Sequence, residues 1–389
     1  MTIRKRLRVL SVLAFAAICG GGAARIGAPP VSLVRVPDGG IQPQVVERDG
    51  IVHLLYFTGD PGGGDLNYVR SLDYGRSFSK PIRVNSQPES AMATGNVRGG
   101  QLALGASGRI HVAWIGSGSA LPRGASNSAP VLYARLNDAG TAFEAQRSVS
   151  QLSWGANVGA DGGTLAADSM NNVYVFWHAQ PPGGKGENTR RVWLARSSDG
   201  GRSFAKETAV NDETTGVCGC CGMRALAGAD GTLHVLFRSA TDLVHRDMYL
   251  LTSNDRGRTF APEKISEWNI GACVMSTEAF AQSANGMLAA WETEKQVYFS
   301  RVTGERAAPI GASGTGENRK YPSLAVNLRG ETLFTWTENM AWKKGGSLAW
   351  QLYDRDLKPQ GPVGKMDGVP VWSLVAAFAK PDGSFAVIY

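Results

Sequence analysis

The sequence predicts an all-β protein, specifically a β-propeller of four-stranded antiparallel blades. Glycine is abundant, at 49 of 389 residues, and the hydrophobic fraction is 43%. Long apolar stretches with helical periodicity are missing, and one short unit recurs along the chain. This combination is typical of many short strands joined by tight turns in a repeat array.

The recurring unit is a turn residue followed by an apolar strand that ends in an aromatic side chain. Successive copies begin about 45 to 65 residues apart, which is the spacing of propeller blades. The seven copies start at Gly50, Gly108, Asn172, Gly231, Gly286, Gly330 and Gly383. Seven copies favour seven blades over six.

Further strands are expected around each copy. A short strand of small apolar residues precedes it, as at 101–104, 225–229 and 323–326. Small residues suit an innermost strand, because the blades crowd together at the axis. The segment 31–36 is a strand without a neighbour in sequence, and the last copy ends at residue 389. Pairing these two segments would close the ring and remove two free sheet edges.

The strongest motif follows the third strand of a blade. The pattern Ser-x-Asp-x-Gly-x-Ser/Thr-aromatic occupies 71–78, 197–204 and 253–260, and a looser copy occupies 136–143. It resembles the Asp-box, or BNR repeat, of the sialidase superfamily. That resemblance implies a single sialidase-like propeller over 25–389. We expect its aspartates to bind backbone N–H groups of their own turns rather than to act as acids. These aspartates are Asp73, Asp138, Asp199 and Asp255.

The first 24 residues read as a signal peptide. Arg4, Lys5, Arg6 and Arg8 precede an apolar run of about eleven residues, and small residues follow. The run is too short to span a bilayer, and Ile18 before Cys19 argues against a lipid anchor. Removing the four basic residues from a net charge of +7 leaves +3, so charge gives no reason to expect a nucleic-acid partner. The mature chain is expected in the periplasm or outside the cell, without a transmembrane segment.

A ligand site is expected on the face opposite the Asp-box turns. In a blade of alternating strands, that face carries the loops entering each innermost strand and those joining the second and third strands. The long loops predicted there are 58–66, 115–130, 178–190 and 338–347. Long loops converging on a central depression are the usual place for a ligand.

The sialidase resemblance implies arginines for a sugar carboxylate, a Tyr nucleophile with a Glu base, and an Asp acid. Arg35 lies in an Arg-Val-Pro sequence similar to that family's first arginine motif. Arg98, Arg224 and Arg319 each stand before an innermost strand. The candidate catalytic residues are Tyr321, Glu278 and Asp60. The alternative is structural: the arginines pair locally, and Tyr321 caps a strand.

Four cysteines of the mature chain are predicted to gather at the axis. Cys218, Cys220 and Cys221 precede the fourth innermost strand, and Cys273 precedes the fifth. Export favours disulfides, with Cys273 bridging two neighbouring blades. A soft site for copper or zinc is the alternative, because Met223 and Met275 lie nearby in sequence. No other cofactor is expected.

These features predict an exported propeller that binds a carbohydrate or glycoprotein. If it is an enzyme, the resemblance implies a glycoside hydrolase of exo-α-sialidase type, acting on terminal acidic sugars. The alternatives are a non-enzymatic scaffold for a protein partner and a metal-binding propeller that uses the cysteines. Asp-box resemblance alone does not transfer activity, because function belongs to the site and not to the fold.

Overall fold

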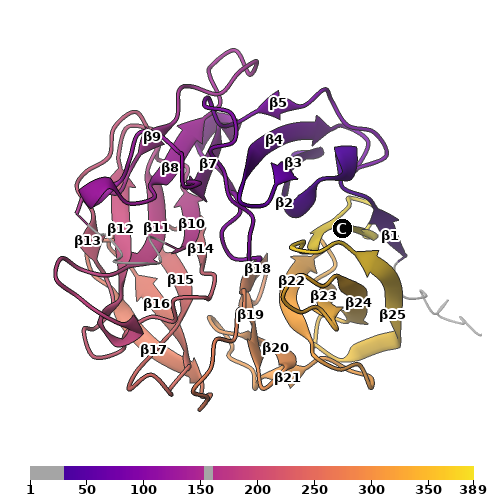
Figure 1. Ribbon diagram of the computed structural model, residues 1–389. Coiled ribbons are helices and arrows are strands. Elements are labelled where there is room, and N and C mark those ends of the chain that lie inside the picture. Colours follow the sequence, from indigo (N-terminus) through magenta and orange to yellow (C-terminus); the bar gives the residue numbers. More distant parts are fainter. Residues whose placement is uncertain (1–29, 153–160) are drawn as a thin grey trace, which may run out of the picture.

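The computed structural model describes residues 30–152 and 161–389. The expected signal peptide, 1–24, lies outside the described residues. In the described part, seven sheets are arranged around a central axis in chain order (Figure 1). Six sheets have four antiparallel strands, as predicted, and the seventh has three. The expectation of seven blades is therefore confirmed.

Each of the first six blades runs from the axis outward in sequence order. Blade one is β2 (Ile41–Arg48), β3 (Ile51–Asp60), β4 (Gly63–Ser71) and β5 (Ile82–Arg83). Blade two is β6 (Gln101–Leu104), β7 (Ile110–Ile115), β8 (Val131–Arg135) and β9 (Arg147–Ser148). Blade three is β10 (Asp161–Ala167), β11 (Val173–Ala179), β12 (Arg191–Ser197) and β13 (Thr208–Ala209).

The second half of the ring continues in the same order. Blade four is β14 (Arg224–Ala227), β15 (Leu233–Arg238), β16 (Met248–Ser253) and β17 (Ala261–Ser266). Blade five is β18 (Ala279–Ser283), β19 (Gly286–Thr293), β20 (Gln296–Arg301) and β21 (Ile310–Gly311). Blade six is β22 (Lys320–Val326), β23 (Thr332–Glu338), β24 (Gly346–Tyr353) and β25 (Pro359–Val369). Four short 3-10 turns, η1 (Pro37–Gly39), η2 (Ala106–Gly108), η3 (Ala125–Asn127) and η4 (Glu187–Thr189), lie between strands.

Blade seven is built from both ends of the described chain. It contains β26 (Ala376–Ala379), β27 (Phe385–Ile388) and β1 (Val31–Val34). β1 pairs with β27 in parallel, with Val31 opposite Phe385 and Val34 opposite Ile388. The predicted pairing of the two ends is confirmed, although this blade has no fourth strand among the described residues. In Figure 1 the C-terminus accordingly lies beside β1.

The core consists of apolar clusters packed between adjacent sheets. The aromatic residues near the ends of the second strands fill much of this core. Of these, Trp114, Trp177, Trp291 and Trp336 are fully buried. Histidines earlier in two of these strands are buried too, with His53 Nδ1 2.7 Å from the Tyr68 hydroxyl and His111 Nδ1 2.6 Å from that of Tyr133. Burial lowers the pKa of His53 to about 4, so it is neutral at physiological pH.

Three of the Ser-x-Asp turns are closed by their carboxylates. Asp73 Oδ1 accepts from Ser77 N at 2.9 Å, and its Oδ2 accepts from the Ser77 hydroxyl at 2.6 Å. The same contacts join Asp199 to Ser203 and Asp255 to Thr259. The turn glycines have positive φ, for example 87° at Gly75, which an L side chain rarely adopts.

The turn at 136–143 is built differently, which corrects the expectation for Asp138. Here Asn137 Oδ1 accepts from Thr141 N at 3.0 Å, while Asp138 is exposed and forms an ion pair with Arg109. The aromatics that end these turns reach the preceding blade. Phe143 packs edge-on against Tyr68, with ring centroids 5.8 Å apart.

The segment 58–66, expected as a long loop, is instead mostly strand. β3 and β4 extend through it, and only the tip at 61–62 is a turn. Loops of the predicted kind do occur at 116–130, 180–190 and 339–345, interrupted only by η3 and η4. Among the described residues, no helix has the length and apolarity needed to cross a membrane.

Candidate functional site

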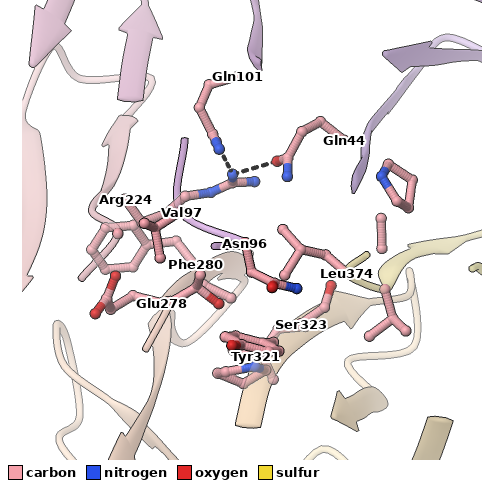
Figure 2. Close-up of a pocket in the computed structure, with 18 of the residues that line it drawn as sticks. Gln44, Asn96, Val97, Gln101, Arg224, Glu278, Phe280, Tyr321, Ser323 and Leu374 are labelled. Carbon is pink, nitrogen blue, oxygen red and sulfur yellow. Dashed lines mark hydrogen bonds between the residues drawn. The ribbon is translucent and has the colours of Figure 1, made fainter. Parts of the chain in front are cut away.

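A channel follows the propeller axis, and the innermost strands form its wall. We call the end opposite the Ser-x-Asp turns the distal face. Near that end a cavity of about 110 Å³ lies between the first residues of the innermost strands. Figure 2 shows its lining, which includes polar side chains from blades one, two, four, five and six. A wider cavity of about 450 Å³ occupies the other end of the channel.

Arg224, the first residue of β14, lines both cavities. Its Nη1 donates to Gln44 Oε1 at 2.7 Å and to Gln101 Oε1 at 2.6 Å (Figure 2). These glutamines belong to β2 and β6, so the guanidinium links blade four with blades one and two. Burial lowers the pKa of Arg224, and Glu278 acts in the opposite direction.

Glu278 and Tyr321 line the same cavity, as expected from the sequence. Both carboxyl oxygens of Glu278 are buried and have no hydrogen-bond partner among the described residues. Burial, and next the neighbouring Cys221, raise the pKa of Glu278 well above its ordinary value. A raised pKa makes the Glu278 carboxyl easier to protonate, and a protonated carboxyl donates a hydrogen bond, whereas the base expected beside a Tyr nucleophile must be ionised.

Arg98 lies on the distal face, in the loop before β6, outside the cavity lining. Its Nε and Nη2 donate to the two oxygens of Asp161 at 2.6 and 3.0 Å, and its Nη1 donates to the Thr94 carbonyl. Asp161 is fully buried at the start of β10. These bonds use all three nitrogens of the Arg98 guanidinium. Sequence reasoning did not identify Asp161 as its partner.

The other three candidates lie away from the cavity lining. Arg319 is buried, with Nε 3.4 Å from Glu338 Oε1 and Nη2 donating to the Ser313 carbonyl at 2.8 Å. Arg35 stacks on the Tyr389 ring at 4.0 Å. Asp60, at the end of β3, accepts from Gly62 N at 2.7 Å. Of the four arginines, only Arg224 lines the axial cavity.

An exposed aromatic side chain lies beside Arg98. Trp342, in the loop between β23 and β24, is 55% exposed. It packs edge-on against Trp372, with ring centroids 4.5 Å apart. A Cβ placed on Gly95 would lie 3.4 Å from Arg98 Nη1 and 3.6 Å from Trp342 Cζ3, so both side chains border this glycine. The following Lys343 and Lys344 are also exposed.

Sequence reasoning identified the loop 338–347 but did not single out Trp342 within it. The available signal was the Trp-Lys-Lys sequence at 342–344, since lysine is almost never fully buried and keeps its neighbours near the surface. The sequence around Asp161 did not indicate an ion pair, because its partner Arg98 is 63 residues away.

The four cysteines meet between blades four and five, as predicted. Cys220 and Cys273 form a disulfide, which confirms the expected bridge between neighbouring blades. Cys218 and Cys221 are buried free thiols with their sulfurs 2.7 Å apart. The Ser276 hydroxyl donates to Cys221 Sγ at 3.6 Å and accepts from Arg238 Nε at 3.0 Å. A disulfide is consistent with an oxidising compartment.

The chain matches no protein family model and no curated protein. Among solved structures, the Hadza microbial sialidase Hz136 is 13% identical, with a TM-score of 0.50 over 81% of this chain and 68% of that one. A protein of unknown function from Dyadobacter fermentans DSM 18053 is 15% identical, with a TM-score of 0.52 over 80% and 94%. Trypanosoma rangeli sialidase in complex with the inhibitor DANA is 13% identical, with a TM-score of 0.50 over 80% and 54%. At this identity the similarity concerns the fold alone. Together with the seven-sheet ring, it shows that this chain has the sialidase-like β-propeller fold.

Proposed function

We propose that the protein is an exported propeller that binds acidic glycans on its distal face without hydrolysing them. Exposed Trp342 supports this proposal, because a sugar ring can stack its apolar face on an indole while its hydroxyls stay in water. Lys343 and Lys344 add two exposed positive charges beside it, and these suit a carboxylate or sulfate on the sugar.

The distal end of the channel is a poor site for a sugar. Its distal cavity of about 110 Å³ is smaller than the roughly 300–1,000 Å³ of ordinary small-molecule sites. Arg98 and Arg319 are each engaged with a carboxylate, at Asp161 and Glu338. A binding surface formed by the loops therefore fits the geometry better than a sialidase pocket with converging arginines.

Titration with 3′-sialyllactose and with lactose tests the proposal, using isothermal calorimetry or NMR. We expect sialyllactose to bind at least tenfold more tightly than lactose, and Trp342→Ala to abolish binding of both. Lys343→Ala/Lys344→Ala should remove the preference for the acidic sugar. Leu328→Ala is the matched control, because Leu328 is 90% exposed in the turn between β22 and β23, at the opposite face.

A fluorogenic sialoside should show no turnover. Turnover that disappears in Tyr321→Phe would replace this proposal with the sialidase alternative. If neither sugar binds at millimolar concentration, the glycan proposal is wrong and the scaffold alternative gains support.

A further inference from the structure

The four sulfur atoms form a bent row of successive contacts from the interior to the surface, in which the sulfurs of Cys218, Cys220 and Cys221 all lie within 4.8 Å of one another. Cys221 Sγ is 2.7 Å from Cys218 Sγ, which is 3.6 Å from Cys220 Sγ, and Cys220 is bonded to Cys273. Cys221 and Cys218 are buried, Cys220 is half-buried and Cys273 is exposed. Every sulfur therefore touches the next one, and only the outer end of the row faces solvent.

The protein holds the inner part of this row in place. Glu187 Oε1 accepts from Gly219 N at 2.7 Å, and its other oxygen pairs with Arg246 Nη2 at 2.6 Å. His178 Nε2 donates to the Cys221 carbonyl at 2.9 Å. The backbone on both sides of Cys220 is thus anchored by two side chains of blade three, and Arg246 of blade four holds one of them, Glu187, in place. Such anchoring fixes the relative positions of the three sulfurs in this loop.

We propose that the four cysteines form a disulfide relay, through which an external disulfide at the surface oxidises the buried pair Cys218 and Cys221. The relay goes beyond glycan binding and does not depend on it. Thiol–disulfide exchange needs an attacking thiolate next to a disulfide sulfur, and the row supplies this arrangement at each step.

The exchange within the protein balances without any outside reagent. The Cys218 thiolate attacks Cys220 Sγ, so that the Cys218–Cys220 bond forms, the Cys220–Cys273 bond breaks, and Cys273 leaves as a thiolate that takes a proton from water. The Cys221 thiolate then attacks Cys218 Sγ, so that the Cys218–Cys221 bond forms and Cys220 leaves as a thiolate. Two electrons pass from the buried pair to the outer pair.

The external substrate is a disulfide RSSR that reaches Cys273. Gly271 and Ala272, which precede Cys273, are also exposed, so small neighbours leave room for approach. The Cys273 thiolate attacks RSSR and releases RS⁻, and Cys220 displaces the second RS⁻ to restore the outer disulfide. Over the whole sequence RSSR gains two electrons and the buried pair loses two. Two thiols RSH leave the site.

Stoichiometric oxidation tests the relay. The full mature protein is reduced, freed of reductant, and treated with one equivalent of glutathione disulfide under nitrogen. Samples are quenched with acid, alkylated, and mapped by non-reducing peptide mass spectrometry. We expect a glutathione adduct or the Cys220–Cys273 bond first, and the Cys218–Cys221 bond later. A Cys218–Cys221 bond that forms before any bond at Cys220 or Cys273 would overturn the relay, as would buried thiols that stay reduced.

Variants give a second readout. In Cys220→Ser/Cys273→Ser, oxidation of the buried pair should be at least tenfold slower than in the wild type. An unchanged rate in this variant would show that the buried pair reacts on its own and would refute the relay. In Cys218→Ser, the disulfide should remain on Cys220 and Cys273. The order of bond formation in the wild type needs no variant, so the test holds even if a substitution prevents folding.

Discussion

Arg224 and Gln44 are joined by a 2.7 Å hydrogen bond although they belong to blades four and one. Arg224→Met would remove this bond and the one to Gln101, leaving two glutamine oxygens in the channel without their charged donor. Hydrogen bonds to charged groups contribute about 1.5 to 3 kcal/mol each. We expect the free energy of unfolding in urea to fall by about 3 kcal/mol.

The matched control for this prediction is Arg355→Met. The Arg355 side chain is 77% exposed, so its replacement should leave the urea midpoint nearly unchanged. Equal stability of the wild type and Arg224→Met would mean that the guanidinium contributes nothing to holding the blades together.

Glu278→Gln should stabilise the protein at alkaline pH more than at acidic pH. The folded-state pKa of Glu278 is raised, so the folded chain keeps a proton that the unfolded chain releases above its ordinary value of 4.5. Stability is therefore lost as pH rises above that value. Glutamine has the same shape and does not ionise. The difference in melting temperature, variant minus wild type, should grow between pH 5 and pH 8, and a constant difference would contradict the assignment.

Arg98→Met should lower the free energy of unfolding by about 3 kcal/mol, because it leaves the buried carboxylate of Asp161 without its partner. Adding Asp161→Asn should restore part of the loss, since an amide carries no charge to desolvate. Urea unfolding of the two single variants and the double variant completes the cycle. Strictly additive losses would show that the two side chains do not depend on each other.

The closing carboxylates of the turns should make the protein acid-sensitive. Hydrogen bonds from Ser77 and Ser71 lower the pKa of Asp73 to about 2, and those of Asp199 and Asp255 are lowered as well. A depressed folded-state pKa contributes stability above the unfolded value of 3.8, and this is lost as pH falls toward 2. In Asp73→Asn/Asp199→Asn/Asp255→Asn, melting temperature should fall less steeply with pH than in the wild type.

Asp138→Asn is the internal control for the acid series. Its carboxylate does not close a turn and instead pairs with Arg109 at the surface. Arg109 lowers the pKa of Asp138 too, but the pair is exposed and screened by salt, so this variant should depart from the wild-type pH profile much less than the triple variant. A triple variant that also follows the wild-type profile would show that the turns do not depend on their charge.

The sequence was sufficient to predict the ring, because repeat spacing and turn residues act locally and recur seven times. Closure of the ring by the segment 31–36 also followed from the sequence. This segment has no neighbouring strand in sequence and the last blade is incomplete, so pairing them removes a free edge from each. The cysteines could be placed together because their positions before two successive innermost strands fix their distance. The extended β3–β4 hairpin depends on packing that the pattern does not encode.

Side-chain partners could not be predicted in the same way. Arg319 stands before an innermost strand like Arg224, yet its guanidinium turns to Glu338 and to carbonyls of blade five. The position of a residue in a repeat determines its backbone conformation and its place in the blade. Its side-chain rotamer, in contrast, depends on charged groups from distant parts of the chain. Asp161 and Arg98 show this dependence, because they are 63 residues apart and in different blades.

The pairing of Val31–Val34 with Phe385–Ile388 also has a consequence for biosynthesis. The Ser32 hydroxyl bonds the Phe385 carbonyl across 353 residues. Until Phe385–Ile388 is available to pair, the first strand has no neighbour, and the ring stays open with two unprotected edges. Contacts so distant along the chain make folding slow. Closure of the ring is therefore expected late in folding, and a chaperone that shields the unpaired strand should improve the yield of soluble protein.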